Sequence, residues 1–177
     1  MIPMEKKIRR LVFWTLTVLT MAAIFLFSSQ TAVDSGALSE GVAGRFYTFF
    51  HRIFPALEVA SWHAFVSFVR KCAHFFCFFC LGLSVTAALS ADVSDRWKNA
   101  LYAFLFCFVY AVSDEVHQLY IPGRAMLFKD VCIDSLGASC AIGIVMLFLL
   151  FTGKEEKRRT FLSARKEKYA KERRRKK

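Results

Sequence analysis

The sequence predicts an all-α, polytopic membrane protein with four transmembrane helices, an interfacial segment and a basic cytoplasmic tail. Of its 177 residues, 56% are hydrophobic and 20 are Phe, which is more apolar material than a soluble domain of this size can cover. Four stretches are apolar over about the 20 residues that a membrane-spanning helix needs. The charge is also uneven, because residues 154–177 hold 13 Lys and Arg against 4 Glu and so carry +9 of the net charge of +11.

The first predicted span covers about residues 8–27. A basic arm precedes it, and its apolar run from Leu11 to Phe27 is longer than the core of an ordinary signal peptide. We therefore expect the span to be retained as a signal anchor. The loop that follows, 31–61, contains a segment from Phe46 to Phe54 in which Phe, Tyr, His and Arg are mixed, and this composition suits a helix that lies in the membrane interface.

Three further spans are predicted at about 70–90, 97–116 and 130–151. A short polar loop over 91–95 separates the first two of these, and the Pro-Gly pair at 122–123 breaks the chain between the last two. The four spans together define a transmembrane domain over residues 1–153, and residues 154–177 form the tail.

The distribution of basic residues orients the four spans, because loops rich in Lys and Arg stay in the cytoplasm. The N-terminal arm, the 91–98 loop and the tail hold 19 Lys and Arg, whereas the opposite side holds 6. Both termini are therefore predicted to be cytoplasmic. The long first loop and the 116–129 loop are predicted to face outward.

This topology gathers ionisable residues from three spans at the outer rim of the membrane. The residues concerned are Arg70, Lys71 and His74 on the second span, Asp114, Glu115, His117 and Gln118 on the third, and Asp130 and Asp134 on the fourth. Ionisable side chains at membrane depth are expected to point inward and to pair, here Arg70 or Lys71 with Asp114 or Asp134. Gly137 follows on the same helical face, and so small a residue allows another helix to approach closely.

Two kinds of chemistry are open to this cluster. Its carboxylate and imidazole side chains could perform acid/base catalysis or hold a divalent cation, although no spacing in the sequence is a specific metal motif. Arg70 and Arg124 could grip a phosphate or carboxylate in bidentate fashion. The candidate core residues are His74, Asp114, Glu115 and Asp134, and the candidate ligand-binding residues are Arg70, Lys71, Gln118, Arg124 and Asp130. Alternatively, the charges anchor helix ends or pair for structural reasons alone, which is the favoured interpretation for Lys71.

Two stretches, 113–124 and 129–137, resemble the VanZ-like family. That family's signature reads D-E-x-x-Q-x-x-x-P-x-R followed by D-x-x-x-[ND]-x-x-G, and both parts are present here. The segment 70–75 is similar to the family's (R/K)-K-x-x-H-F element, and Ser28-Ser29-Gln30 is similar to its S-S-Q pattern. The positions that match the family's motifs are Lys71, His74, Asp114, Glu115, Gln118, Arg124, Asp130 and Asp134.

The resemblance implies a multi-pass protein of the bacterial plasma membrane that belongs to the cell envelope. The founding member of the family is associated with resistance to the glycopeptide teicoplanin. No settled biochemical activity comes with the family, so whether the protein is an enzyme, and which cofactor or metal it uses, stays open.

The favoured hypothesis is a protein that binds or modifies an amphiphilic envelope component at the extracytoplasmic face and so affects glycopeptide sensitivity. The ligand would be a lipid-linked envelope precursor or the glycopeptide itself. The alternative is a non-catalytic scaffold or partner of envelope enzymes in which the charges serve helix packing. A transporter is less favoured, because the sequence has no visible internal repeat.

The basic tail is predicted to form a frayed helix that either docks on anionic lipid headgroups or stays solvated. Such attraction is worth about 1 kcal/mol per basic residue near the membrane surface. A nucleic-acid partner is not expected, because no aromatic platform or groove-reading motif accompanies the charge.

Overall fold

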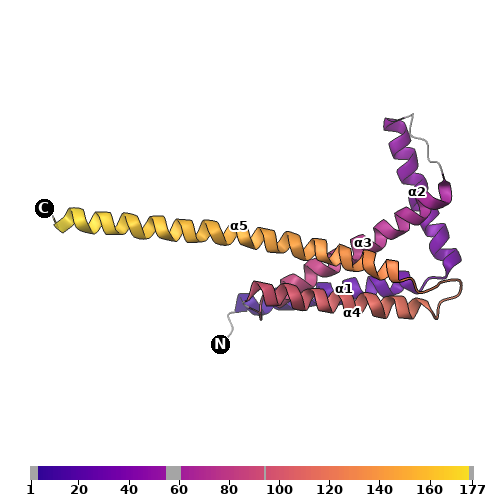
Figure 1. Ribbon diagram of the computed structural model, residues 1–177, viewed down its shortest axis with the longest axis horizontal. Helices are drawn as coiled ribbons and strands as arrows, with labels where there is room; N and C mark the ends of the chain where they lie inside the picture. The colour runs from indigo at the N-terminus through magenta and orange to yellow at the C-terminus, as the bar shows by residue number, and fades with distance from the viewer. Residues whose placement is uncertain (1–3, 55–60, 94, 176–177) are drawn as a thin grey trace. The chain divides into compact units, whose positions relative to one another are not determined.

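The computed structural model describes residues 4–54, 61–93 and 95–175, with side chains described as far as Phe151 except that of Lys6. The described residues form five helices and no strand (Figure 1). The helices are α1 (Met4–Ser28), α2 (Ala32–Ile53), α3 (Trp62–Leu89), α4 (Arg96–Gln118) and α5 (Phe128–Arg175).

Four of these helices are long and apolar enough to cross a membrane, and the chain is a multi-pass membrane protein. Their spanning parts are Lys7–Ser28, Trp62–Leu89, Arg96–Gln118 and Phe128–Phe151. Large apolar side chains such as Leu11 and Phe148 are 71% and 65% exposed, as expected for surfaces in contact with lipid tails. The prediction of an all-α protein with four spans is therefore confirmed.

Side-chain caps begin three of the helices. Thr31 accepts a hydrogen bond from Asp34 N at the start of α2, and Ser61 accepts one from Ala64 N at the start of α3. Asp95 accepts from the backbone N–H groups of Trp97 and Lys98, and these bonds lower the pKa of its carboxyl. The helix boundaries therefore follow capping residues rather than the ends of the apolar runs.

Two predicted boundaries are wrong. The helix that holds the second span begins at Trp62 rather than at residue 70, so Arg70 and Lys71 lie more than two turns inside it. The predicted loop over 31–61 is largely helical, because α2 occupies 22 of its residues, while 55–60 lie outside the described residues. The interfacial segment predicted at Phe46–Phe54 is the second half of this longer helix.

Helix α2 fits the predicted interfacial position. Figure 1 shows it steeply inclined to α1 and α4, which run side by side. Several of its large apolar residues are exposed, among them Val33, Phe46, Phe49 and Ile53. An inclined helix with an exposed apolar face would lie along the membrane surface if α1 and α4 cross the bilayer.

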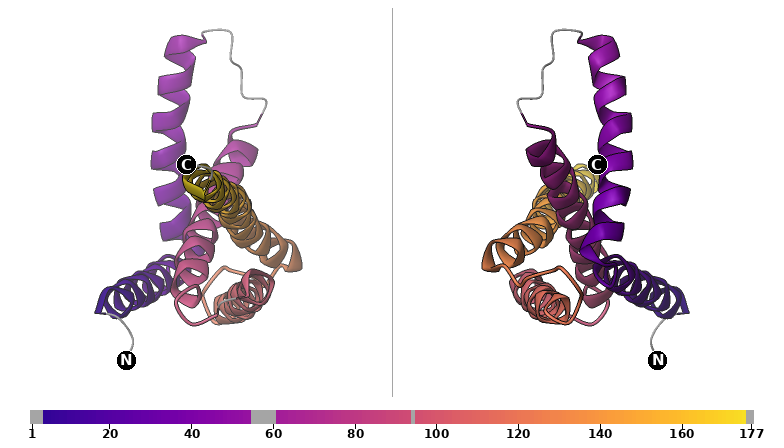
Figure 2. Two further views of the ribbon diagram at one scale, coloured as in Figure 1. Left: turned by 90° about the vertical axis from the view of Figure 1, so that its left-hand side faces the viewer. Right: turned by 90° about the vertical axis from the view of Figure 1, so that its right-hand side faces the viewer.

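Helix α3 lies at the centre of the buried core. It packs against α1, α2 and α4, and α1 also touches α4 (Figure 2). Phe78, Leu81, Val85 and Ala88 of α3 are fully buried. The first unit of the chain, Met1–Ile142, contains this core and the first four turns of α5.

Small residues let α3 and α5 approach closely, as the sequence pattern predicts. A Cβ atom added to Gly82 of α3 would lie 2.8 Å from the carbonyl oxygen of Ala138, and 3.1 Å from the Cβ of Ala141. A Cβ added to Gly137 would overlap the backbone of Phe75. This contact places the N-terminal turns of α5 against the middle of α3.

The remainder of α5 forms the second unit, Gly143–Lys177, which continues the helix to Arg175. The predicted domain boundary after residue 153 lies inside this helix and stays a prediction. Lys176 and Lys177, the end of the predicted lipid-docking tail, lie outside the described residues.

We expect reporter fusions to give the predicted orientation. Green fluorescent protein fused to the C-terminus will fluoresce, because it folds in the cytoplasm, and alkaline phosphatase fused after Gly123 will be active outside. Alkaline phosphatase fused after Val93 is the matched control and will be inactive. The reversed pattern would show that the chain is inserted the other way round.

Candidate functional site

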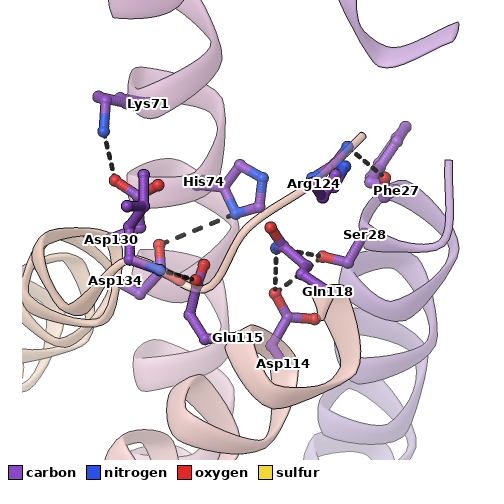
Figure 3. Close-up of polar contacts among 11 residues, drawn as sticks. Phe27, Ser28, Lys71, His74, Asp114, Glu115, Gln118, Arg124, Asp130 and Asp134 are labelled. Atoms are coloured by element: carbon purple, nitrogen blue, oxygen red, sulfur yellow. Dashed lines mark hydrogen bonds and ion pairs between the residues drawn. The ribbon is translucent and has the colours of Figure 1, made fainter. Parts of the chain in front are cut away.

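A polar cavity of about 240 Å³ lies where α3, α4 and the first turns of α5 meet the α4–α5 turn (Figure 3). It is lined by eight of the nine predicted site residues, namely Arg70, Lys71, His74, Glu115, Gln118, Arg124, Asp130 and Asp134. The structure thus brings together residues that are more than 60 positions apart, while their roles stay predictions.

Asp114, the ninth predicted residue, lies beside this cavity and joins α4 to α1. It is 4% exposed, and its Oδ2 accepts hydrogen bonds from Ser28 Oγ at 2.8 Å and from Gln118 Nε2 at 3.2 Å (Figure 3). Hydrogen bonds to a buried carboxylate are stronger than those between neutral groups. The Ser28–Asp114 contact therefore helps to hold the two spans together.

Facing side chains of α3 and α5 meet at two levels. Lys71 forms an ion pair with Asp130, and His74 Nδ1 lies 3.9 Å from Asp134 Oδ1 one turn further along (Figure 3). The predicted pairing of Arg70 or Lys71 with Asp114 or Asp134 is therefore wrong. The reason is the axial register of the two helices. Helices α3 and α5 run in the same direction, so successive turns of α3 face successive turns of α5.

The side chain of Asp134 accepts no hydrogen bond from the described residues. It is 1% exposed, and neither of its carboxylate oxygens has a hydrogen-bond partner among the described residues. Arg70 likewise forms no ion pair within the described part of the chain. Among the described residues, the site therefore contains a buried carboxylate without a hydrogen bond and a guanidinium without an ion pair.

The buried side chain of Glu115 holds the α4–α5 turn in place. It is 1% exposed, and its Oε2 accepts a hydrogen bond of 3.0 Å from the backbone N–H of Leu127. Glu115 also lines the polar cavity.

Arg124 fastens the same turn to the end of α1. Its Nε donates to the carbonyl oxygen of Gln30 at 3.0 Å, and one terminal nitrogen donates to that of Phe27 at 3.5 Å. Burial and the nearby charge of Arg70 lower the pKa of the Arg124 guanidinium. An arginine still stays protonated at neutral pH, so the cavity keeps two positive charges on this side.

The turn needs glycine at position 123. Gly123 has a φ of 75°, and an added Cβ would lie 2.9 Å from the Cβ of Ala32. The backbone N–H of Ala32 also donates to the carbonyl oxygen of Pro122. The Pro-Gly-Arg segment therefore packs directly on the start of α2.

His117 lies at the same rim but faces α1 and does not line the polar cavity. Its Nε2 is 3.1 Å from Ser29 Oγ, and its ring stacks on Phe25 with centroids 4.7 Å apart. It therefore contributes to helix packing rather than to the candidate site.

An apolar cavity of about 320 Å³ adjoins the polar one between α1, α2 and α3. Arg70 and His74 line both cavities, so the two share one wall. Most of the other lining residues are apolar, among them Ile24, Phe27, Leu38, Val42, Val69 and Ala73. A ligand with a charged head and an apolar tail could therefore occupy both spaces.

Sequence reasoning missed several groups that build the site. Ser28 was noted only as part of the S-S-Q match, yet it bonds to Asp114. The carbonyl oxygens of Phe27 and Gln30 and the N–H of Leu127 also take part. Backbone groups carry no sequence pattern of their own, so only the S-S-Q motif could have pointed to this region.

We expect the Ser28→Ala variant to be less stable by about 1–3 kcal/mol, because Asp114 loses a buried hydrogen bond. Thermal unfolding in detergent would measure the change. The control is Thr20→Val on the same helix, since the hydroxyl of Thr20 donates to Leu16 O within α1. Equal stability of both variants would show that the Ser28–Asp114 bond contributes nothing.

A family model described as VanZ/LLP1 matches residues 13–150 of the chain. The match covers the second and third spanning segments, most of the first and fourth, and all nine candidate site residues. No curated protein and no solved structure matches the chain significantly.

Proposed function

This chain belongs to the VanZ/LLP1 family, and from that premise we propose that it binds an anionic amphiphile of the cell envelope from the extracytoplasmic side. Through this binding it alters sensitivity to teicoplanin-type glycopeptides. The observation that carries the proposal is the pair of adjoining cavities, one polar and one apolar, that share Arg70 and His74.

The polar cavity would take the anionic head. Arg70 has no ion-pair partner among the described residues, so its guanidinium is available for a phosphate or carboxylate. Arg124 lines the same cavity and adds a second positive charge. The basic side chains of this wall thus supply the attraction that a phosphorylated or carboxylated head needs.

The apolar cavity would take the tail. Its volume of about 320 Å³ lies at the lower end of the range for ligand pockets. It is bounded by α2, which carries an exposed apolar face suited to the membrane interface. A lipid chain could therefore enter from the bilayer while its head stays in the polar cavity.

The test uses the full chain in detergent with a polyprenyl phosphate as probe and the corresponding polyprenol as comparison. We expect the phosphate to bind and Arg70→Gln to weaken its binding roughly tenfold, the value of one charged hydrogen-bonded contact. The control is Arg52→Gln, an exposed arginine of α2 that lines neither cavity. Native mass spectrometry would measure occupancy.

Equal binding of the phosphate and the alcohol would contradict a role for the polar cavity. Equal binding by the wild type and Arg70→Gln would do the same. In both cases, the alternative of a non-catalytic scaffold with structural charges would then be favoured.

A further inference from the structure

We propose that His74, Asp114 and Asp134 form a binding site for one divalent metal ion. Each residue offers one ligand atom, and these three atoms lie within 4.8 Å of one another. They come from three different helices, α3, α4 and α5, and Figure 3 shows the side chains of His74 and Asp134 turned toward each other. The site goes beyond the proposed function, because an ion can bind here whether or not an amphiphile does.

The carboxylate of Asp134 accepts no hydrogen bond from the described residues, and this points to a missing ligand. Both of its oxygens are buried without a hydrogen-bond partner in the described part of the chain. Burying a polar group without a hydrogen bond is unfavourable, and more so when the group is charged. Coordination of a cation by one of these oxygens would compensate the charge of the carboxylate.

Three basic side chains line the polar cavity; two of them are engaged elsewhere, and Arg70 forms no ion pair with either aspartate among the described residues. Lys71 is paired with Asp130, and Arg124 donates to backbone carbonyls at the end of α1. Neither Asp114 nor Asp134 has an ion pair with Lys or Arg among the described residues. Two buried carboxylates therefore lie close together with His74 as their neighbouring ionisable base, and a bound cation would compensate their charge.

Asp114 has the supporting contacts of a metal ligand. Ser28 and Gln118 both donate to its Oδ2. Hydrogen bonds of this kind orient ligating carboxylates and tune their affinity. Asp114 would therefore present its carboxylate in a fixed direction.

The donor set favours a transition-metal ion over Mg²⁺ or Ca²⁺. One imidazole nitrogen with two carboxylates suits Zn²⁺ or Mn²⁺, whereas Mg²⁺ and Ca²⁺ prefer oxygen ligands alone. Metal–ligand bonds of about 2.0–2.2 Å place neighbouring donors roughly 3.0–3.6 Å apart. The three side chains must therefore draw together by roughly an ångström when the ion binds. Because His74 and Asp134 line the polar cavity, the remaining coordination positions would face it.

The experiment titrates Mn²⁺ into the full chain in detergent after removal of metals with EDTA, with no amphiphile present. Electron paramagnetic resonance measures the concentration of free Mn²⁺. This ion binds thiolates weakly, so the six free cysteines should not compete for it. We expect one Mn²⁺ per chain, displaced by an excess of Zn²⁺. Asp134→Asn should weaken Mn²⁺ binding roughly tenfold or more.

Asp130→Asn is the matched control, one turn away on the same helix face and outside the three-residue set. It should weaken Mn²⁺ binding clearly less than Asp134→Asn does, since it removes a more distant charge that is already paired with Lys71. His74→Gln is the second variant, so the test still works if Asp134→Asn fails to fold.

Absence of saturable Mn²⁺ binding by the wild type would overturn the proposal, as would equal weakening by Asp134→Asn and Asp130→Asn. Arg70→Gln separates the two proposals. It should keep Mn²⁺ binding while losing polyprenyl phosphate, so failure of either proposal can be recognised without the other.

Discussion

Replacing Gly137 by Ala will strongly destabilise the protein, because the new Cβ atom would overlap the carbonyl oxygen of Phe75. The same Cβ would lie 3.1 Å from the carbonyl carbon and 3.3 Å from the Cα of Phe75. These are backbone atoms of α3, which cannot rotate away as a side chain can. Helix α5 must therefore shift away from α3, at the cost of about 1–3 kcal/mol that overpacking typically carries. The shift would also displace Asp134, which lies three residues, or about 4.5 Å, away along the same helix.

Gly143→Ala is the matched control for this prediction. Gly143 lies on the same helix, and a Cβ added there would meet nothing within 4 Å. Alanine should stabilise an uncrowded helical position by up to about 1 kcal/mol relative to glycine. Thermal unfolding in detergent and protein abundance in membranes would measure both variants. If Gly137→Ala were as stable as Gly143→Ala, the close contact between α3 and α5 would be refuted.

Glu115→Gln will leave the protein folded and abolish its function. The amide oxygen of glutamine can still accept the hydrogen bond from Leu127 N, which Glu115 Oε2 accepts at 3.0 Å. The α4–α5 turn therefore stays in place, while the cavity loses a carboxylate that can carry charge or a proton. We expect teicoplanin sensitivity of the host to return to that of cells without the protein.

The measurement compares glycopeptide susceptibility with the amount of protein in the membrane. Glu40→Gln, at an exposed position of α2, is the control and should change neither. Equal loss of abundance and function in Glu115→Gln would favour the scaffold alternative, in which the charges serve packing. Full function of Glu115→Gln would show that the site does not need this charge.

The spans could be predicted from the sequence because apolar length and polar breaks are local properties. The start of α3 could not, because Arg70 and Lys71 look like the end of a span. In the structure both line a polar cavity, so the helix continues past them to Trp62. A charged residue that faces protein rather than lipid does not end a transmembrane helix.

The helical character of the first half of α2 could not be predicted, for a different reason. Three glycines, at 36, 41 and 44, lower the helix propensity of this stretch. In the structure a Cβ at any of them would meet nothing within 4 Å, so they neither turn the chain nor allow close packing. Capping by Thr31 and burial of Ser35 and Ala43 favour the helix instead.

The gathering of the site residues followed from topology, but their pairing did not. Span direction places Lys71, His74, Asp130 and Asp134 at one end of the bundle. Which of them meet depends on the axial register of α3 against α5, which Gly137 and Phe75 set by direct contact. No local pattern in the sequence encodes that register.

The central claim is that residues far apart in the sequence meet in one buried cluster, and cysteine cross-linking tests it most directly. In a background without native cysteines, the pairs Ser28→Cys with Asp114→Cys and Lys71→Cys with Asp130→Cys should cross-link rapidly in membranes with the shortest bifunctional thiol reagent. Thr20→Cys with Asp114→Cys, two turns away on α1, should not. Cross-linking of the two site pairs no faster than this control pair would contradict the account.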